Sequence, residues 1–206
     1  MTGALPASLP LISKADRRCP GWALDNRIRR WWAPARHEVD PLSIQPGHRI
    51  VDLGAGVGYV TAVLLERVGP AGSVILVDPD ARSLGMARMR WGPDRRVQFI
   101  QASAAHIPMI AEASADGVVL SLVLCCMVEK GGALDEAWRI LRPGGLVMAS
   151  YPERRWRLSA RKMSLRVSSE IWSRLVGGHP WRVVASHKRR FIRRHLLQKP
   201  SIDPSA

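Results

Sequence analysis

Residues 51–59 read VDLGAGVGY, and the architecture of the chain can be worked out from this stretch. Its pattern is a buried strand ending at Leu53, a turn that holds three glycines, and a helix that begins at Tyr59. Glycines let the backbone turn tightly and allow a ligand to lie against bare main chain, facing the N–H groups of the helix. The stretch therefore predicts a strand–turn–helix unit with a ligand site at the turn.

Around this unit, short apolar runs alternate with helical segments. The expected strands are 48–53, 73–78, 97–101, 116–124, 146–151, 181–186 and 191–198, with a basic bridge over 187–190. The expected helices are 24–32, which stops at Pro34 and has room for another short helix after it, 59–68, 81–90, 132–141 and 153–176. Such alternation calls for a parallel sheet covered by helices on both faces.

The composition limits the class of protein. A chain of 206 residues, 47% of them apolar, makes room for one domain with a sizeable core. No apolar run is long enough for a spanning helix, and the first 20 residues read as a loose arm without a secretory signal. Three cysteines, two of them adjacent at Cys125 and Cys126, give neither a disulfide framework nor metal-ligand spacing. We therefore expect a cytoplasmic protein without a metal.

Positive charge is concentrated at one end of the sequence. The net charge is +14, from 31 basic and 17 acidic residues. Residues 1–46 carry 7 basic and 4 acidic residues, residues 47–151 carry 10 of each, and residues 152–206 carry 14 and 3. A neutral body with a basic C-terminal quarter indicates a face that meets an anionic partner, although an arginine-rich solvated surface would have the same composition.

Asp78 ends the second strand 20 residues after Gly58, where a carboxylate of a doubly wound sheet reaches the hydroxyls of a bound ribose. A dinucleotide fingerprint would need its third glycine at position 59, which is tyrosine here; the third glycine falls at Gly58 instead. The turn is also entered through an acidic residue, Asp52. A nucleoside ligand is therefore expected, and a nicotinamide dinucleotide becomes a distant alternative.

The pattern D-x-G-x-G-x-G over 52–58 resembles the first motif of the class I S-adenosylmethionine-dependent methyltransferases. Residues 141–145 (LRPGG) and 115–121 (ADGVVLS) are similar to the turn before this family's fifth strand and to its fourth strand. The resemblance covers about residues 22–199 and implies an α/β, doubly wound, Rossmann-like fold: a mostly parallel seven-stranded sheet with helices on both faces and an antiparallel last strand. It implies S-adenosylmethionine as cofactor, held by Asp52, Gly54, Ala55, Gly56, Gly58, Asp78, Pro79, Ser103, Ala104 and Ser121.

Two stretches depart from the family pattern. Many members have an acidic residue after the third strand to receive the adenine amino group, and Ser103 takes that place here. After the fourth strand many members read V-L-H-H-V, whereas residues 123–127 read VLCCM. These departures concern the roles of individual residues and leave the expected fold unchanged.

Methyl transfer from a sulfonium depends chiefly on aligning the acceptor with the methyl group, and a base is needed only where the acceptor must lose a proton. The candidates near the strand ends are Tyr151, Cys126 and His37. Tyr151 is the preferred acceptor-side residue. Buried cysteines are more often small core residues than functional thiols, and His37 is interpreted chiefly as a surface residue.

The expected helix over 153–176 has two apolar rows at about 100° per residue. One row, which should face the sheet, contains Trp156, Ala160, Met163, Val167 and Ile171. The other contains Leu158, Leu165 and Trp172, lies nearly opposite, and is bordered by basic residues. A second row of this kind is typical of a membrane-surface helix or an anionic-partner site, or of a dimer interface or a lid over the acceptor pocket. Trp31 and Trp32 beside Arg29 and Arg30 repeat the composition.

The expected organisation is an arm with substrate-covering helices over 1–46, a methyltransferase domain over 47–199 that includes a basic amphipathic helix over 154–176, and a disordered tail over 200–206. The leading hypothesis is methyl transfer to a small-molecule or lipid-headgroup acceptor, with peripheral contact at an anionic inner-membrane surface left open. An RNA methyltransferase and an inactive cofactor-binding partner protein are the alternatives. The acceptor and the oligomeric state stay open.

Overall fold

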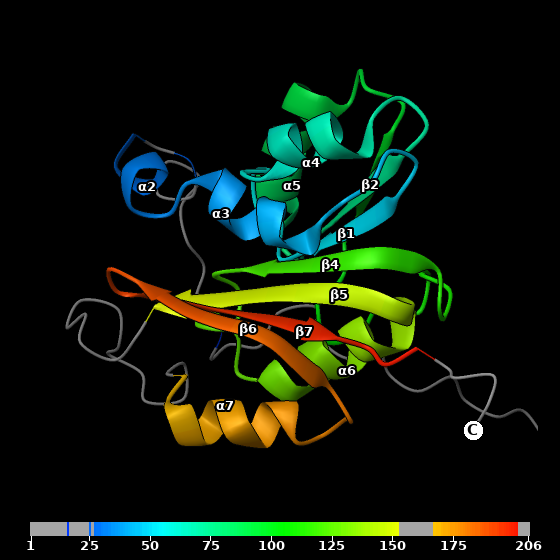
Figure 1. The fold of residues 1–206 in the computed structure, drawn as a ribbon. Coiled ribbons are helices and arrows are strands. Elements are labelled where there is room, and N and C mark those ends of the chain that lie inside the picture. Colours follow the sequence, from blue (N-terminus) through cyan, green and yellow to red (C-terminus); the bar gives the residue numbers. More distant parts are fainter. Residues whose placement is uncertain (1–15, 17–24, 26, 153–166, 202–206) are drawn as a thin grey trace, which may run out of the picture.

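The computed structural model describes Asp16, Asp25 and residues 27–152 and 167–201, and they fold around one seven-stranded sheet (Figure 1). The strands are β1 (Arg49–Leu53), β2 (Ser73–Val77), β3 (Val97–Ile100), β4 (Ala115–Ser121), β5 (Leu141–Pro152), β6 (Arg182–Arg189) and β7 (Ile192–Gln198). The helices are α2 (Arg27–Trp32), α3 (Ala35–Val39), the 3-10 turn η1 (Asp40–Leu42), α4 (Thr61–Val68), α5 (Ala81–Trp91), α6 (Lys130–Ile140) and α7 (Ser169–Val176).

The order of strands across the sheet is β3-β2-β1-β4-β5-β7-β6. The first five strands pair in parallel, while β7 runs antiparallel to both β5 and β6. This topology confirms the doubly wound, Rossmann-like class expected from the sequence. In such sheets ligands bind beyond the carboxyl ends of the strands, where the strand order reverses, and here that point lies between β1 and β4.

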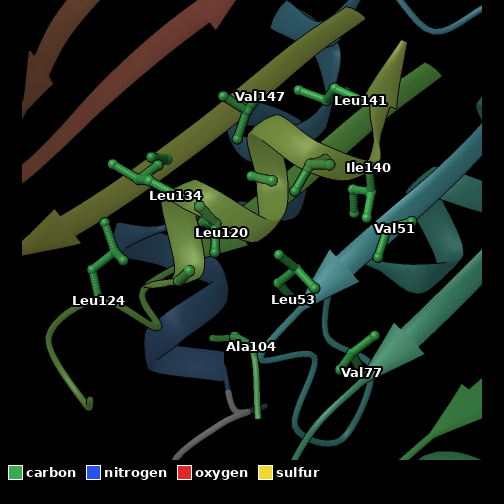
Figure 2. Close-up of a cluster of buried hydrophobic side chains, with 14 of the residues drawn as sticks. Val51, Leu53, Val77, Ala104, Leu120, Leu124, Leu134, Ile140, Leu141 and Val147 are labelled. Carbon is green, nitrogen blue, oxygen red and sulfur yellow. The ribbon is translucent and has the colours of Figure 1, made fainter. Parts of the chain in front are cut away.

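Helices cover both faces of the sheet. In Figure 1, α2, α3, α4 and α5 lie on one side of the sheet, and α6 and α7 lie on the other. The apolar core is divided accordingly. Figure 2 shows the layer around α6, where Leu134 and Ile140 pack against the sheet residues Leu53, Leu120 and Val147. Strand residues therefore alternate between two buried layers, which explains why β1 and β4 read as continuous apolar runs.

The predicted helix over 153–176 is confirmed over its last eight residues, as α7, but it does not extend through residues 167–168. Val167 and Ser168 are not helical, and residues 153–166 lie outside the described part of the chain. Ser168 instead caps a new helix, α7, because its hydroxyl accepts a hydrogen bond of 3.2 Å from the Ile171 N–H. Trp172 was expected on the outward row, but it is 8% exposed and packs in the core. Among the expected core-facing residues, Val167 is buried and Ile171 is half-buried.

Three strand boundaries also differ from expectation. The fourth strand ends at Ser121, because Leu122 adopts a left-handed conformation with φ +59° and the chain turns away. The 187–190 bridge mostly continues β6, and the hairpin turns at Arg190 with φ +57°. The LRPGG turn lies within the bounds of β5, where the pairing with β4 shifts register and Gly144 has φ +81°.

Candidate functional site

The glycine turn follows β1 at the point where the strand order reverses. Gly54, Gly56 and Gly58 have φ values of +77°, +58° and +76°. This left-handed backbone conformation is strained for residues that carry a Cβ, so it favours glycine. A Cβ at Gly54 would overlap the Val123 side chain, and one at Gly58 would approach Trp91 Nε1 to 2.7 Å. The Gly54 and Ala55 N–H groups donate to the Val77 carbonyl at 2.8 and 3.0 Å. These constraints hold bare main chain at the predicted cofactor turn.

Asp78, at the end of β2, ties the second strand to this turn. Its carboxylate accepts hydrogen bonds of 2.7 Å from the Gly56 N–H and 2.8 Å from the Asp80 N–H. Burial raises the pKa of Asp78, and the two backbone N–H groups oppose that rise. Pro79 is half-buried beside it. Asp78 therefore shapes the turn, in addition to its predicted contact with a ribose.

Asp52, the acidic residue of the motif, lies in β1 with 2% of its surface exposed. Burial raises the pKa of Asp52 to about 7; Arg29 lowers it, while Asp78 and Glu38 raise it further. Within the described part of the chain, no group donates a hydrogen bond to this carboxylate. A buried carboxylate without donors favours a ligand that brings positive charge and N–H groups.

Arg29 brings α2 to the glycine turn, a contact that the sequence interpretation did not include. Arg29 is 7% exposed, and its guanidinium carbon lies 4.0 Å from the ring centroid of Tyr59. The Tyr59 hydroxyl donates a 2.8 Å hydrogen bond to the Ala33 carbonyl, just after α2. The N-terminal helices therefore close over the cofactor turn.

A buried ion pair joins α3 to β7 on the same face of the sheet. Glu38 is 0% exposed and Arg194 is 5% exposed. Arg194 Nε donates to Glu38 Oε1 at 2.8 Å, and Arg194 Nη2 lies 2.7 Å from the same oxygen. The other carboxylate oxygen, Glu38 Oε2, is buried without a hydrogen-bond partner. Neither residue was among the predicted site residues.

The ends of β3 and β4 carry three further predicted residues. Ser103 makes a tight turn, because its hydroxyl accepts a 3.2 Å hydrogen bond from the Ala105 N–H, and Ala104 is buried inside that turn. Ser121 ends β4, and its hydroxyl is buried without a hydrogen-bond partner. Of these three residues, Ser121 has the atom most in need of a ligand.

The three candidate bases occupy different environments. Tyr151 is 1% exposed, and its hydroxyl lies 3.0 Å from His195 Nε2 in the core. Burial lowers the pKa of His195 to about 4, which keeps this ring neutral. The geometry does not support the predicted acceptor contact of Tyr151, because its hydroxyl is enclosed. His37 accepts a 2.8 Å hydrogen bond from Arg189 at the β6–β7 turn.

Cys126 lies in the loop after β4, where the sequence departs from the family pattern. It is half-buried, and its Sγ lies 3.6 Å from the Leu122 carbonyl oxygen and 3.8 Å from Cys125 Sγ. Both thiols therefore sit at the carboxyl end of the strand that borders the glycine turn. A catalytic role for Cys126 stays a prediction.

The comparisons with known proteins agree with this geometry. Residues 51–149 match the family described as methyltransferase domain. The chain is 33% identical over 124 residues to the ubiquinone/menaquinone biosynthesis C-methyltransferase UbiE of Pasteurella multocida, an overlap that is 59% of this chain and 45% of that protein. It is 34% identical over 121 residues to the UbiE of Stenotrophomonas maltophilia, covering 57% of this chain and 47% of that protein. The chain thus spans about half the length of these relatives.

Two solved structures share the fold. A SAM dependent methyltransferase from Aquifex aeolicus superposes with a TM-score of 0.77 at 15% identity, covering 87% of this chain and 96% of that one. The [4+2]-cyclase SpnF superposes with a TM-score of 0.68 at 15% identity, covering 84% and 80%. The methyltransferase-domain match indicates S-adenosylmethionine as the cofactor. Residues 51–149 therefore match a methyltransferase domain, and the sheet around them has the fold of a solved SAM dependent methyltransferase.

Proposed function

We propose that the protein transfers a methyl group from S-adenosylmethionine to a small-molecule or lipid-headgroup acceptor. The observation that supports this most directly is the buried Asp52 carboxylate, which lacks a hydrogen-bond donor and stands before a turn of three left-handed glycines. A cofactor that carries an ammonium and a sulfonium on its methionine end would satisfy such a carboxylate, whereas a neutral ligand would not.

The residues present fit this cofactor. Asp52 and the bare main chain from Gly54 to Gly58 would hold its methionine end, and Asp78 with Pro79 would lie beside its ribose. Ser103 and Ala104 would border the adenine, and Ser121 would offer its hydroxyl near the methyl group. When bound, S-adenosylmethionine supplies an already activated methyl group. The protein then has to align an acceptor and exclude water.

The acceptor side is less defined than the cofactor side. The curated relatives are named C-methyltransferases of ubiquinone/menaquinone biosynthesis, which supports a small organic acceptor. A basic, tryptophan-bearing rim supports contact with an anionic membrane: Trp31 is 66% exposed, and the Arg190 guanidinium carbon lies 3.5 Å from the centroid of its ring. Among the described residues, no helix is long and apolar enough to cross a membrane. We propose a peripheral contact at the cytoplasmic side.

Calorimetric titration with S-adenosylmethionine tests the proposal. We expect Asp52→Asn to weaken binding about tenfold or more, since it removes a buried charge–charge contact. Asp135→Asn, at an exposed carboxylate on α6, is the matched control and should bind like the wild type. The proposal fails if the wild-type protein does not bind the cofactor, or if Asp52→Asn changes nothing. Radiolabelled methyl transfer into lipid, RNA and small-molecule extracts then identifies the acceptor class.

A further inference from the structure

One oxygen of the buried Glu38 carboxylate is not bound by its partner Arg194. We infer that Glu38 binds the cationic methionine end of S-adenosylmethionine together with Asp52, an inference that rests on the proposed function. It makes α3, outside the matched methyltransferase domain, part of the cofactor site.

The first observation is the unused oxygen of Glu38. A structural ion pair between an arginine and a carboxylate is commonly bidentate, with each oxygen accepting one N–H. Here Nη2 and Nε of Arg194 both approach Oε1, at 2.7 and 2.8 Å, but only Nε is aligned to donate a hydrogen bond, and Oε2 is buried without a partner. Leaving a charged oxygen buried and unpaired costs free energy, because the desolvation of that oxygen is not repaid by a hydrogen bond. A bound donor would remove that cost.

The second observation is the position of Glu38 relative to Asp52. The charge of Glu38 raises the pKa of Asp52, and Arg29 lowers it, so the three charged groups lie within electrostatic reach of one another. The strand register agrees. Asp52 pairs with Val119 in β4. Ser121 lies two residues further along β4 on the same face and pairs with Ser150, which pairs with Arg194, so Arg194 lies one row beyond Asp52 toward the carboxyl ends of β1 and β4, on the face covered by α3.

The third observation is the charge balance of this region. Three buried carboxylates, those of Asp52, Asp78 and Glu38, stand against the two buried guanidinium groups of Arg29 and Arg194. One negative charge is therefore in excess, and the raised pKa of Asp52, caused mainly by burial, is consistent with that excess. The methionine end of the cofactor carries an ammonium, a sulfonium and a carboxylate. Two carboxylates and one arginine at the site complement that set.

The test is calorimetric binding of three ligands to Glu38→Gln. S-adenosylmethionine should bind about tenfold or more weakly, whereas 5′-methylthioadenosine, which lacks the amino-acid part, should bind as to the wild type. S-adenosylhomocysteine keeps the ammonium but loses the sulfonium charge. An equal loss for both cofactor forms would assign Glu38 to the ammonium, and a larger loss for S-adenosylmethionine would assign it to the sulfonium. Glu66→Gln, on the exposed side of α4, is the matched control.

Glu38→Gln leaves Arg194 buried without its counter-charge and could reduce folding on its own. The double variant Glu38→Gln/Arg194→Gln removes both charges and keeps the inference testable. Its loss of cofactor affinity should equal that of the single variant. Wild-type affinity in either variant, or an equal loss for 5′-methylthioadenosine, would overturn the inference while leaving the proposed function intact. Absence of cofactor binding by the wild-type protein would overturn the proposed function first.

Discussion

At the scale of single residues, the proposed contact of Asp52 with the cofactor would couple binding to pH. Burial holds its pKa at about 7 in the free protein, so at pH 6 most molecules carry a proton there. A cationic ligand requires the ionised carboxylate, and binding below pH 7 must therefore release that proton. We expect the affinity for S-adenosylmethionine to rise about tenfold per pH unit up to 7 and then level off.

Calorimetry in buffers with different ionisation enthalpies measures the proton release directly. The matched variant is Asp52→Asn, which should bind more weakly and lose the pH dependence below 7. A flat affinity profile for the wild-type protein between pH 5 and 7 would contradict this assignment.

The sequence predicted the glycine turn after β1, because glycine at positions 54, 56 and 58 permits the positive φ values that the turn adopts. Glu38 and Arg194 were missed, although the sequence carried a signal for each. Glu38 shares a helical face with Pro34 and the buried Leu42, and Arg194 alternates with Ile192 and Leu196 in a strand. A charged residue at the same spacing as buried apolar ones indicates a paired or ligand-binding group. Which residue pairs with it depends on tertiary contacts between segments 156 residues apart.

At the scale of elements, α7 shows why the outward position predicted for Trp172 was wrong. The prediction placed Leu158, Leu165 and Trp172 in one row at seven-residue spacing. That placement holds only if residues 153–176 form one continuous helix, in which the angle around the axis advances by the same amount at every residue. Ser168 breaks that continuity by capping a new helix. The Trp172 ring then stacks on His195, 4.1 Å between centroids, and packs near Tyr151. A helix break shifts every face downstream of it.

The same packing predicts a large loss of stability for Trp172→Ala. The substitution removes a buried aromatic ring that joins α7 to β5 and β7, and we expect it to lower the free energy of unfolding by about 3–5 kcal/mol. Urea unfolding followed by circular dichroism measures the difference. Arg174→Ala, on the exposed side of α7, should change stability by less than about 0.5 kcal/mol. A loss below about 1 kcal/mol at Trp172 would show that α7 is not docked as described.

At the scale of the whole molecule, the charge is organised around the sheet. The neutral domain carries the cofactor turn, and basic residues gather at the opposite edge from β3, on the exposed strand β6 and its turn into β7. That turn contacts the N-terminal helices through Arg189 with His37 and through Arg190 with Trp31. The described basic residues at the β6–β7 turn and the N-terminal helices therefore meet at one rim, although they are far apart in the sequence.

This arrangement predicts that charge reversal at the rim weakens binding to anionic membranes selectively. Lys188→Glu/Arg190→Glu should reduce co-sedimentation with phosphatidylglycerol vesicles about tenfold or more, because each basic residue near such a surface contributes about 1 kcal/mol. Arg82→Glu/Arg95→Glu changes the net charge equally at exposed positions near the β3 edge of the sheet, and it should bind like the wild type. Equal losses of vesicle binding in both variants would show that net charge alone attracts the protein to the membrane. No loss of binding in either variant would show that the rim does not bind membranes. The two double variants change the net charge by the same amount but at different places. They therefore distinguish binding through the rim from attraction by the net charge of the whole protein.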